Sequence, residues 1–206
     1  ALCALLILIL GTVLSSQISN GVYREKLNAS ISEADSLVNF EQGQFDATTY
    51  RKDLKLKTVL DNIFHTGDLN TTSIQREVIL MPTPKTAAIS SKFQGSSNYL
   101  DFNIISQDLR TRVRKNFNMQ HEYVTIKYLT GVQVRGIAVG STITLPSSLE
   151  YEIYYLFPLT QQEQLIRFIE VLLWISGAIL ILLITLITWY VTGRIVRPVR
   201  EAAEIA

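Results

Sequence analysis

The residues of this chain that could do chemistry are few and far apart. Its only histidines are His65 and His121, and the nearest second metal ligand at a helical spacing is Asp68, three residues after His65. No nucleophile motif, phosphate-binding loop or dinucleotide-binding glycine pattern occurs in the 206 residues. The sequence therefore predicts no catalytic residue, no metal site and no cofactor within this chain.

Two carboxylates, Glu150 and Glu152, lie two residues apart in a stretch that alternates with apolar side chains. Alternation of this kind is typical of a strand and places both carboxylates on one face. Such a pair could share a proton or hold a cation. Since the apolar residues occupy the opposite face, we expect both carboxylates to lie on a solvated outer surface.

A dense run of positive charge is the strongest candidate for a binding surface. The run falls in a predicted amphipathic helix whose apolar residues Ile105, Leu109, Val113 and Phe117 recur every four positions. Its members are Arg110, Arg112, Arg114 and Lys115. They could bind an anionic envelope polymer, a lipid head group or an acidic partner, or they could form a solubilising helix face. Both interpretations place the side chains in solvent, so that replacing the three arginines should leave the fold intact.

The elements that position these groups follow from the uneven distribution of apolar residues. The chain is 48% hydrophobic and 18% charged with a net charge of +1, which gives no reason to expect a nucleic-acid partner. Residues 1–14 and 171–191 contain no charged side chain. As a helix, residues 168–191 would be about 36 Å long, enough to cross a hydrocarbon core of roughly 30 Å. The first stretch is either a signal sequence or a spanning helix that lacks its beginning, and the missing cleavage pattern favours the helix.

Four segments are therefore predicted in a multi-pass protein of the cell membrane. Residues 1–19 form a first transmembrane helix, truncated at its N-terminus, and residues 168–192 form the second. Arginines 194, 197 and 200 follow the second helix closely, which favours a cytoplasmic location for that side. Residues 20–167 then form one extracytoplasmic domain, and residues 193–206 begin a cytoplasmic helix.

The pattern within residues 20–167 predicts an α+β domain. A helix continues from the first membrane segment to Gly43, and Asp46 caps a second helix that ends at Gly67. A short strand near a sheet edge covers residues 78–81, and after the amphipathic helix three consecutive antiparallel strands cover residues 121–129, 132–145 and 149–157. We expect the helices to cover one face of the sheet, as in a PAS-like or Cache-like sensor domain.

The segment after the second apolar stretch carries a coiled-coil pattern. Ile195, Val199, Ala202 and Ala206 repeat at spacings of four, three and four, a seam that requires a partner helix and so predicts a homodimer. With Arg197 and Pro198 at its start, the segment resembles the beginning of a HAMP linker. The residues expected to transmit a signal are Pro158 at the end of the third strand, and Arg197, Pro198 and Val199.

Three stretches resemble the actinobacterial MtrB family of sensor histidine kinases. They are Tyr154–Leu159 with Gln161–Gln164, the segment 197–206, and Leu14–Asn20. The resemblance covers about the first 40 and the last 55 residues, and no matching motif lies between them.

The resemblance implies a dimeric membrane receptor that uses ATP and Mg²⁺ to autophosphorylate on a cytoplasmic histidine. It also implies transfer of the phosphoryl group to the response regulator MtrA and an envelope lipoprotein, LpqB, as partner. The kinase domain itself is not among residues 1–206. The residues alone leave open a HAMP-linked receptor with another output, such as a chemoreceptor or a cyclase, and a non-enzymatic envelope-binding module held by its spans among membrane lipids.

Overall fold

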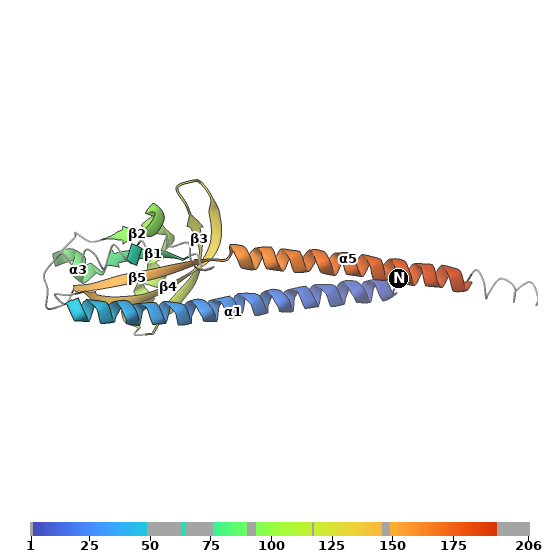
Figure 1. The fold of residues 1–206 in the computed structure, drawn as a ribbon, viewed down its shortest axis with the longest axis horizontal. Helices are drawn as coiled ribbons and strands as arrows, with labels where there is room; N and C mark the ends of the chain where they lie inside the picture. The colour runs from blue at the N-terminus through green and yellow to red at the C-terminus, as the bar shows by residue number, and fades with distance from the viewer. Residues whose placement is uncertain are drawn as a thin grey trace, which may run out of the picture. The chain divides into compact units, whose positions relative to one another are not determined.

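A computed structural model describes residues 2–48, 63–64, 76–89, 94–116, 118–145 and 149–192. The chain divides into two compact units, one made of residues 1–23 and 163–206 and the other of residues 24–162. In chain order the elements are α1 (Leu2–Thr48), β1 (Glu77–Pro82), α3 (Pro84–Ile89), β2 (Gly95–Ser96), η1 (Ser97–Tyr99), η2 (Phe102–Ile104), α4 (Gln107–Lys115), β3 (Gln120–Lys127), β4 (Gln133–Leu145), β5 (Leu149–Pro158) and α5 (Thr160–Val191) (Figure 1).

The strands form one five-stranded antiparallel sheet in the order β2-β1-β5-β4-β3. The predicted meander of three strands is confirmed, and in its first turn Gly131 has a φ of 81°, a conformation that favours glycine. The predicted position of β1 near an edge is also confirmed, since only the two-residue β2 lies beyond it. The α+β class with an antiparallel sheet therefore holds.

Helices cover both faces of this sheet, not one as we expected. The odd-numbered residues of β5 face α1, as the contact between Tyr155 and Glu41 of α1 shows. The even-numbered residues face α4, as the contact between Glu152 and Arg110 of α4 shows. Residues Tyr151 to Phe157 are consequently all buried.

The short helix α4 packs on the sheet as its apolar spacing predicts. Ser106 caps it by accepting a hydrogen bond from the Leu109 amide at 3.0 Å. Leu109 and Val113 are fully buried among residues of β1, β3, β4 and β5. Gly140 of β4 allows this close approach, because a Cβ atom there would lie 2.9 Å from Val113 Cγ2 and 2.5 Å from two ring carbons of Tyr154.

Helix α1 is unbroken from Leu2 to Thr48, so the predicted end at Gly43 is wrong. A single glycine costs an exposed helix only about 1 kcal/mol relative to alanine. Burial of Val38 and Phe45 on either side of Gly43 offsets that cost. Most of the predicted second helix, residues 46–67, lies outside the described residues.

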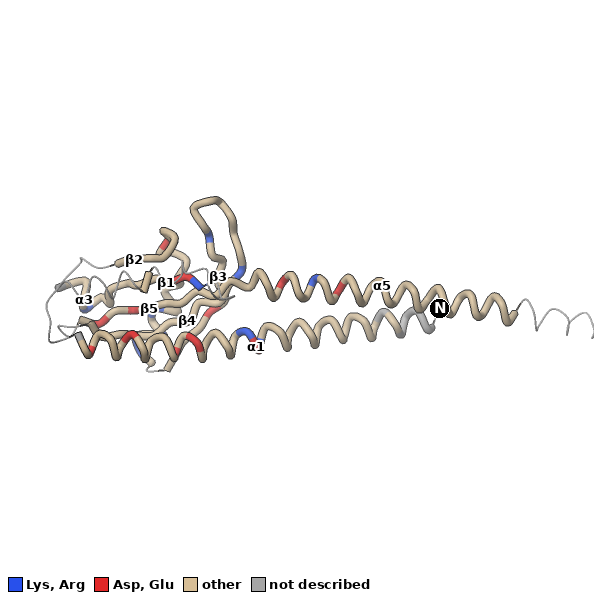
Figure 2. Tube along the Cα trace, viewed as in Figure 1, with Lys and Arg blue, Asp and Glu red and all other residues tan. Residues whose placement is uncertain are grey.

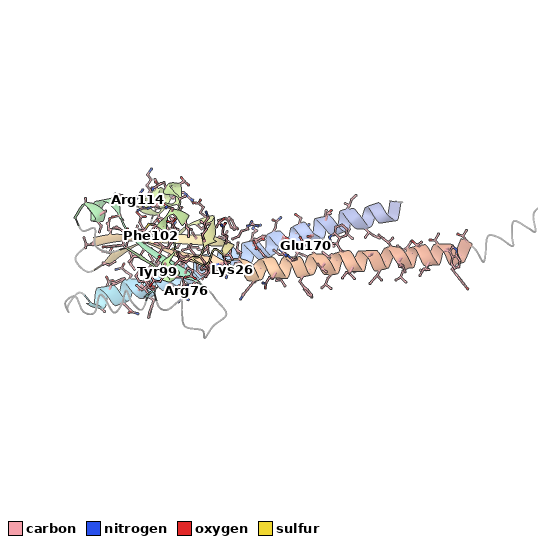
Figure 3. All side chains as sticks on the ribbon, turned by 90° about the horizontal axis from the view of Figure 1, so that it is seen from above. Lys26, Arg76, Tyr99, Phe102, Arg114 and Glu170 are labelled. Carbon is pink, nitrogen blue, oxygen red and sulfur yellow. The ribbon has the colours of Figure 1, made fainter. Side chains whose placement is uncertain are left out.

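Helix α5 has 32 residues and is the one helix in the described part of the chain that is long and apolar enough to cross a membrane. Its charged residues are confined to its first part (Figure 2). From Val171 to Val191 the side chains are apolar or hydroxyl-bearing, and most of the large apolar ones are exposed along the helix (Figure 3). Such a surface is suited to a hydrocarbon surrounding.

Two glycine substitutions should have opposite effects on stability. Gly140→Ala should lower the free energy of unfolding by about 1–3 kcal/mol, because the new methyl group collides with Tyr154 and Val113. Gly43→Ala, with no atom within 4 Å of the new Cβ, should raise it by up to about 1 kcal/mol. Denaturant unfolding of the purified chain in detergent measures both. Equal effects of the two substitutions would contradict the close packing of α4 on β4.

Candidate functional site

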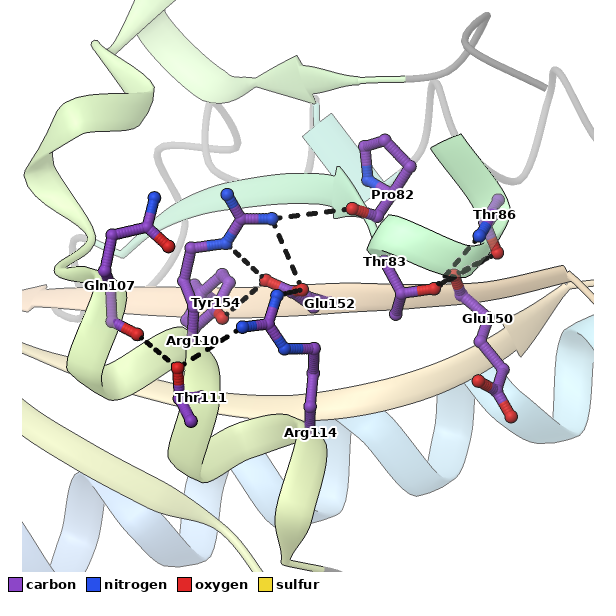
Figure 4. Close-up of polar contacts among 10 residues, drawn as sticks. All are labelled: Pro82, Thr83, Thr86, Gln107, Arg110, Thr111, Arg114, Glu150, Glu152 and Tyr154. Atoms are coloured by element: carbon purple, nitrogen blue, oxygen red, sulfur yellow. Dashed lines mark hydrogen bonds and ion pairs between the residues drawn. The ribbon is translucent and has the colours of Figure 1, made fainter. Parts of the chain in front are cut away.

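Glu152 is the centre of a buried polar cluster between β5 and α4 (Figure 4). Its side chain is 0% exposed. It accepts hydrogen bonds from Arg110 Nε at 2.7 Å and Nη2 at 3.3 Å, from Arg114 Nη1 at 3.3 Å and from the Tyr154 hydroxyl at 2.9 Å. Four donors from three side chains thus surround one carboxylate.

The charges within the cluster compensate one another. The hydrogen bond to Glu152 raises the pKa of Arg110, and burial together with the nearby charge of Glu152 raises the pKa of Tyr154. Two cations and a neutral phenol therefore face one anion. A buried charge is tolerated when its partners satisfy it in this way, and removal of a partner is costly. The chemistry of the cluster is that of an anchor that holds α4 on the sheet.

This arrangement changes the interpretation of the basic run. The expectation of a solvent-exposed face is wrong for Arg110 and Arg114, whose side chains are only 21% and 27% exposed and point to Glu152. Arg112 pairs with Asp108 at 3.0 Å and with Glu122 at 3.6 Å, and Lys115 is exposed. Replacing all three arginines would disrupt the anchor. A role of Arg110, Arg112, Arg114 and Lys115 in ligand binding stays a prediction.

The predicted pair of carboxylates is split by the same packing. Glu150 is exposed as expected, whereas the expectation of a solvated position for Glu152 is wrong because α4 covers that face of β5. Alternation in sequence cannot show that a second face is covered.

A second buried carboxylate lies on the opposite face of β5. Glu41 of α1 is 7% exposed and accepts a hydrogen bond of 2.6 Å from the Tyr155 hydroxyl. Burial raises the pKa of Glu41 to about 7, although the hydrogen bond from Tyr155 and the charge of Arg76 oppose this. Arg76 itself pairs with Glu33 of α1 at 3.1 Å. The contact joins α1 to β5 through a group that titrates near neutral pH.

The sequence does contain a signal for the burial of Glu41. Ala34 and Val38 are four residues apart and share one face of the helix predicted there, and the next positions on that face are 41 and 45. Phe45 is buried as the spacing requires, and Glu41 is the one carboxylate in the series. A charged residue at a core position of a helix is itself a pointer to a partnered, perturbed group.

A third buried carboxylate, Glu77 of β1, holds the 3-10 helix η1. It accepts hydrogen bonds from Ser97 Oγ at 2.5 Å and from Asn98 Nδ2 at 2.8 Å. Asn98 has a φ of 49°, a conformation that asparagine tolerates better than most residues. Burial and the charge of Glu77 also raise the pKa of Tyr128 to about 12.

The end of β5 is firmly fixed to the sheet. Pro158 pairs with Gly136, and the Leu159 amide donates to the Arg135 carbonyl at 2.8 Å. The Leu159 side chain is fully buried, and α5 begins at Thr160, so Gln161–Arg167 is helical and continuous with the apolar part of α5. Of the four predicted signal-transfer residues, Pro158 lies at this junction, and Arg197, Pro198 and Val199 lie outside the described residues.

Comparison with known proteins gives no family. No protein-family model matches the chain, and no curated protein is significantly similar to it. Within the described ranges, no group of three or more His, Cys, Asp or Glu side chains is arranged to hold a metal ion.

Glu152→Gln should destabilise the fold by about 2–4 kcal/mol, because it leaves Arg110 and Arg114 without their anion. Partial exposure of both guanidinium groups to water limits this cost. Glu150→Gln, two residues away but exposed, is the matched control and should change stability by less than about 0.5 kcal/mol. Urea unfolding of both variants measures the difference. A neutral Glu152→Gln would show that the cluster does not anchor α4.

The raised pKa of Glu41 predicts that stability falls as pH rises. Between the ordinary carboxyl pKa of 4.5 and about 7, the folded state holds a proton that the unfolded state releases. This group therefore favours folding below that window, and the advantage, on the order of 3 kcal/mol, is lost by pH of about 7.

Midpoints of urea unfolding, measured at several pH values between about 5 and 8, test this effect. Glu41→Gln should flatten the slope, whereas Glu25→Gln, an exposed glutamate of the same helix, should keep it. An unchanged slope in Glu41→Gln would assign the pH dependence to another group.

Proposed function

We propose that this chain is the sensor portion of a membrane histidine kinase, in which the domain of residues 24–162 detects an envelope signal and α5 carries it across the membrane. The observation that supports this most directly is the junction of β5 and α5. A single residue, Leu159, separates the central part of the sheet from a helix suited to span a bilayer. Strand displacement would reach the helix with little slack.

The two contacts on opposite faces of β5 support an input role for this strand. Glu152 connects β5 to α4, and Tyr155 connects it to α1. A ligand or partner that moves either helix would therefore act on the strand that leads into α5. We propose that Pro158, as the last residue of β5, takes part in this transfer.

Contacts within the unit of residues 1–23 and 163–206 support the proposal of a first membrane helix. The Ser15 hydroxyl donates to Glu170 at 3.3 Å, and a Cβ atom on Gly177 would lie 3.5 Å from Ile7 Cγ2. Gly11, Ser15 and Ser19 recur every four residues beside a groove of about 660 Å³ between α1 and α5. Small residues and interhelical hydrogen bonds are the usual means by which membrane helices associate.

The remaining parts of the proposal rest on the sequence pattern. Residues 20–167 are extracytoplasmic, in the manner of a PAS-like or Cache-like sensor, and Arg197, Pro198 and Val199 begin a HAMP-type coiled coil in a homodimer. A downstream kinase domain that uses ATP and Mg²⁺ would phosphorylate a response regulator. An envelope lipoprotein is the proposed partner outside.

Uncoupling of the sheet from α5 tests this proposal. In the intact receptor, Glu41→Gln should change the rate of histidine autophosphorylation, because it alters the joint between α1 and β5. A Gly-Gly-Ser-Gly insertion after Thr160 should remove that response, since it interrupts the direct connection between β5 and α5. The same insertion after Thr130, in the exposed β3–β4 turn, is the matched control and should preserve it.

Measurement of ³²P incorporation in membrane vesicles gives the four rates of this double-mutant cycle. A response to Glu41→Gln that survives the insertion after Thr160 would contradict transmission through β5. A receptor without any phosphohistidine would contradict the kinase output and favour a different class of HAMP-linked protein.

A further inference from the structure

A groove of about 640 Å³ lies between α1 and the sheet, apart from the Glu152 and Glu41 contacts. Its α1 wall is a polar stripe at positions 28, 32, 35, 39 and 42, with spacings of four and three that place them on one face of the helix. The stripe is about 21 Å long and runs beside the buried stripe that contacts the sheet. The other wall comes from Asn118 and Met119 before β3 and from Ser141 and Thr142 of β4.

At one end of the groove, the Gln42 side-chain amide pairs with the backbone of β4 as a neighbouring strand would. Gln42 Oε1 accepts from the Thr144 amide at 2.9 Å, and Gln42 Nε2 donates to the Thr144 carbonyl at 3.1 Å. The β3–β4 ladder begins at the pair Gln120–Gly140, so Gln42 takes a position beside β4 that β3 does not reach. A direct contact between α1 and β4 therefore closes this end of the groove.

The other polar groups of the groove have no partner among the described residues. No side chain of Asn28, Ser32, Asp35, Asn39, Asn118, Ser141 or Thr142 forms a hydrogen bond or ion pair with another described residue. On the opposite face of the sheet, by contrast, both carboxylate oxygens of Glu152 accept hydrogen bonds. These donors and acceptors are therefore available to a ligand.

The chemistry of the walls selects the class of ligand. Amide and hydroxyl side chains offer donors and acceptors side by side, and Asp35 is the single ionisable residue among those that line the groove. Without a lysine, arginine or histidine in this lining, the groove does not favour phosphate or carboxylate ligands. Ile31, Val38 and Met119 add apolar surface for the C–H face of a ring.

We infer that this groove binds a neutral, polyhydroxylated ligand, namely a short oligosaccharide. Sugar hydroxyls donate and accept at once, as amide and hydroxyl walls require, and the carboxylate of Asp35 can accept from two neighbouring hydroxyls. The volume lies within the roughly 300–1,000 Å³ typical of small-molecule sites. The inference concerns binding alone and does not depend on the signalling proposed above.

Binding of a panel of neutral trisaccharides built from glucose, galactose, mannose and N-acetylglucosamine tests the inference. Saturation-transfer NMR on the full chain in nanodiscs identifies the bound sugar, and calorimetry gives its Kd. Asn39→Leu and Ser141→Ala, one on each wall, should each weaken binding about 3- to 10-fold, as expected for the loss of one neutral hydrogen bond. Asn103→Leu, an exposed asparagine outside the groove, should leave the Kd unchanged.

Circular dichroism of each variant separates loss of binding from loss of fold. Failure of the whole panel to bind would overturn the inference, and so would binding that Asn39→Leu and Ser141→Ala leave unchanged in folded protein. Saturable binding of a neutral tetrapeptide or of an anionic sugar, without any neutral sugar, would assign the groove to a different ligand class and likewise overturn it.

Discussion

The burial of β5 on both faces is the constraint on which the rest of this structure depends. A strand with one solvated face can leave its polar side chains to water, but the part of β5 from Tyr151 to Phe157 cannot. Glu152 must therefore find its cations within the fold, and Tyr155 must find an acceptor. These two side chains join α4 and α1 to the sheet, in addition to the apolar packing of Leu109 and Val113.

Local signals in the sequence were sufficient for much of this architecture. The α4 helix is predictable because Ser106 can cap it and because Leu109 and Val113 share one face. The meander is predictable because alternation and the Thr130–Gly131 turn are both short-range features. Long-range packing was the part that could not be predicted. Nothing near Glu152 in the sequence shows that a helix more than thirty residues earlier in the chain covers it.

The same limit applies to the candidate sites. Arginines 110 and 114 look like a binding surface in sequence because their anion is supplied by a distant strand. Gly43 looks like a helix end in sequence because the contacts that hold α1 beside it, of Glu41 with Tyr155 and of Gln42 with Thr144, come from distant strands. The groove beside α1 could not be predicted from the sequence for a related reason, since its two walls are more than seventy residues apart in the chain. In each case a tertiary partner overrides a correct local rule.

The fixed end of β5 also bears on how the unit of residues 24–162 could be exchanged between proteins. Leu159 belongs to the sheet, since its amide and its side chain are both held there, although it lies beyond the last paired residue. A recombination point placed before it would expose an apolar side chain in one product and leave a vacant core position in the other. The natural boundary for a modular exchange is therefore Thr160, where the chain first becomes part of the helix.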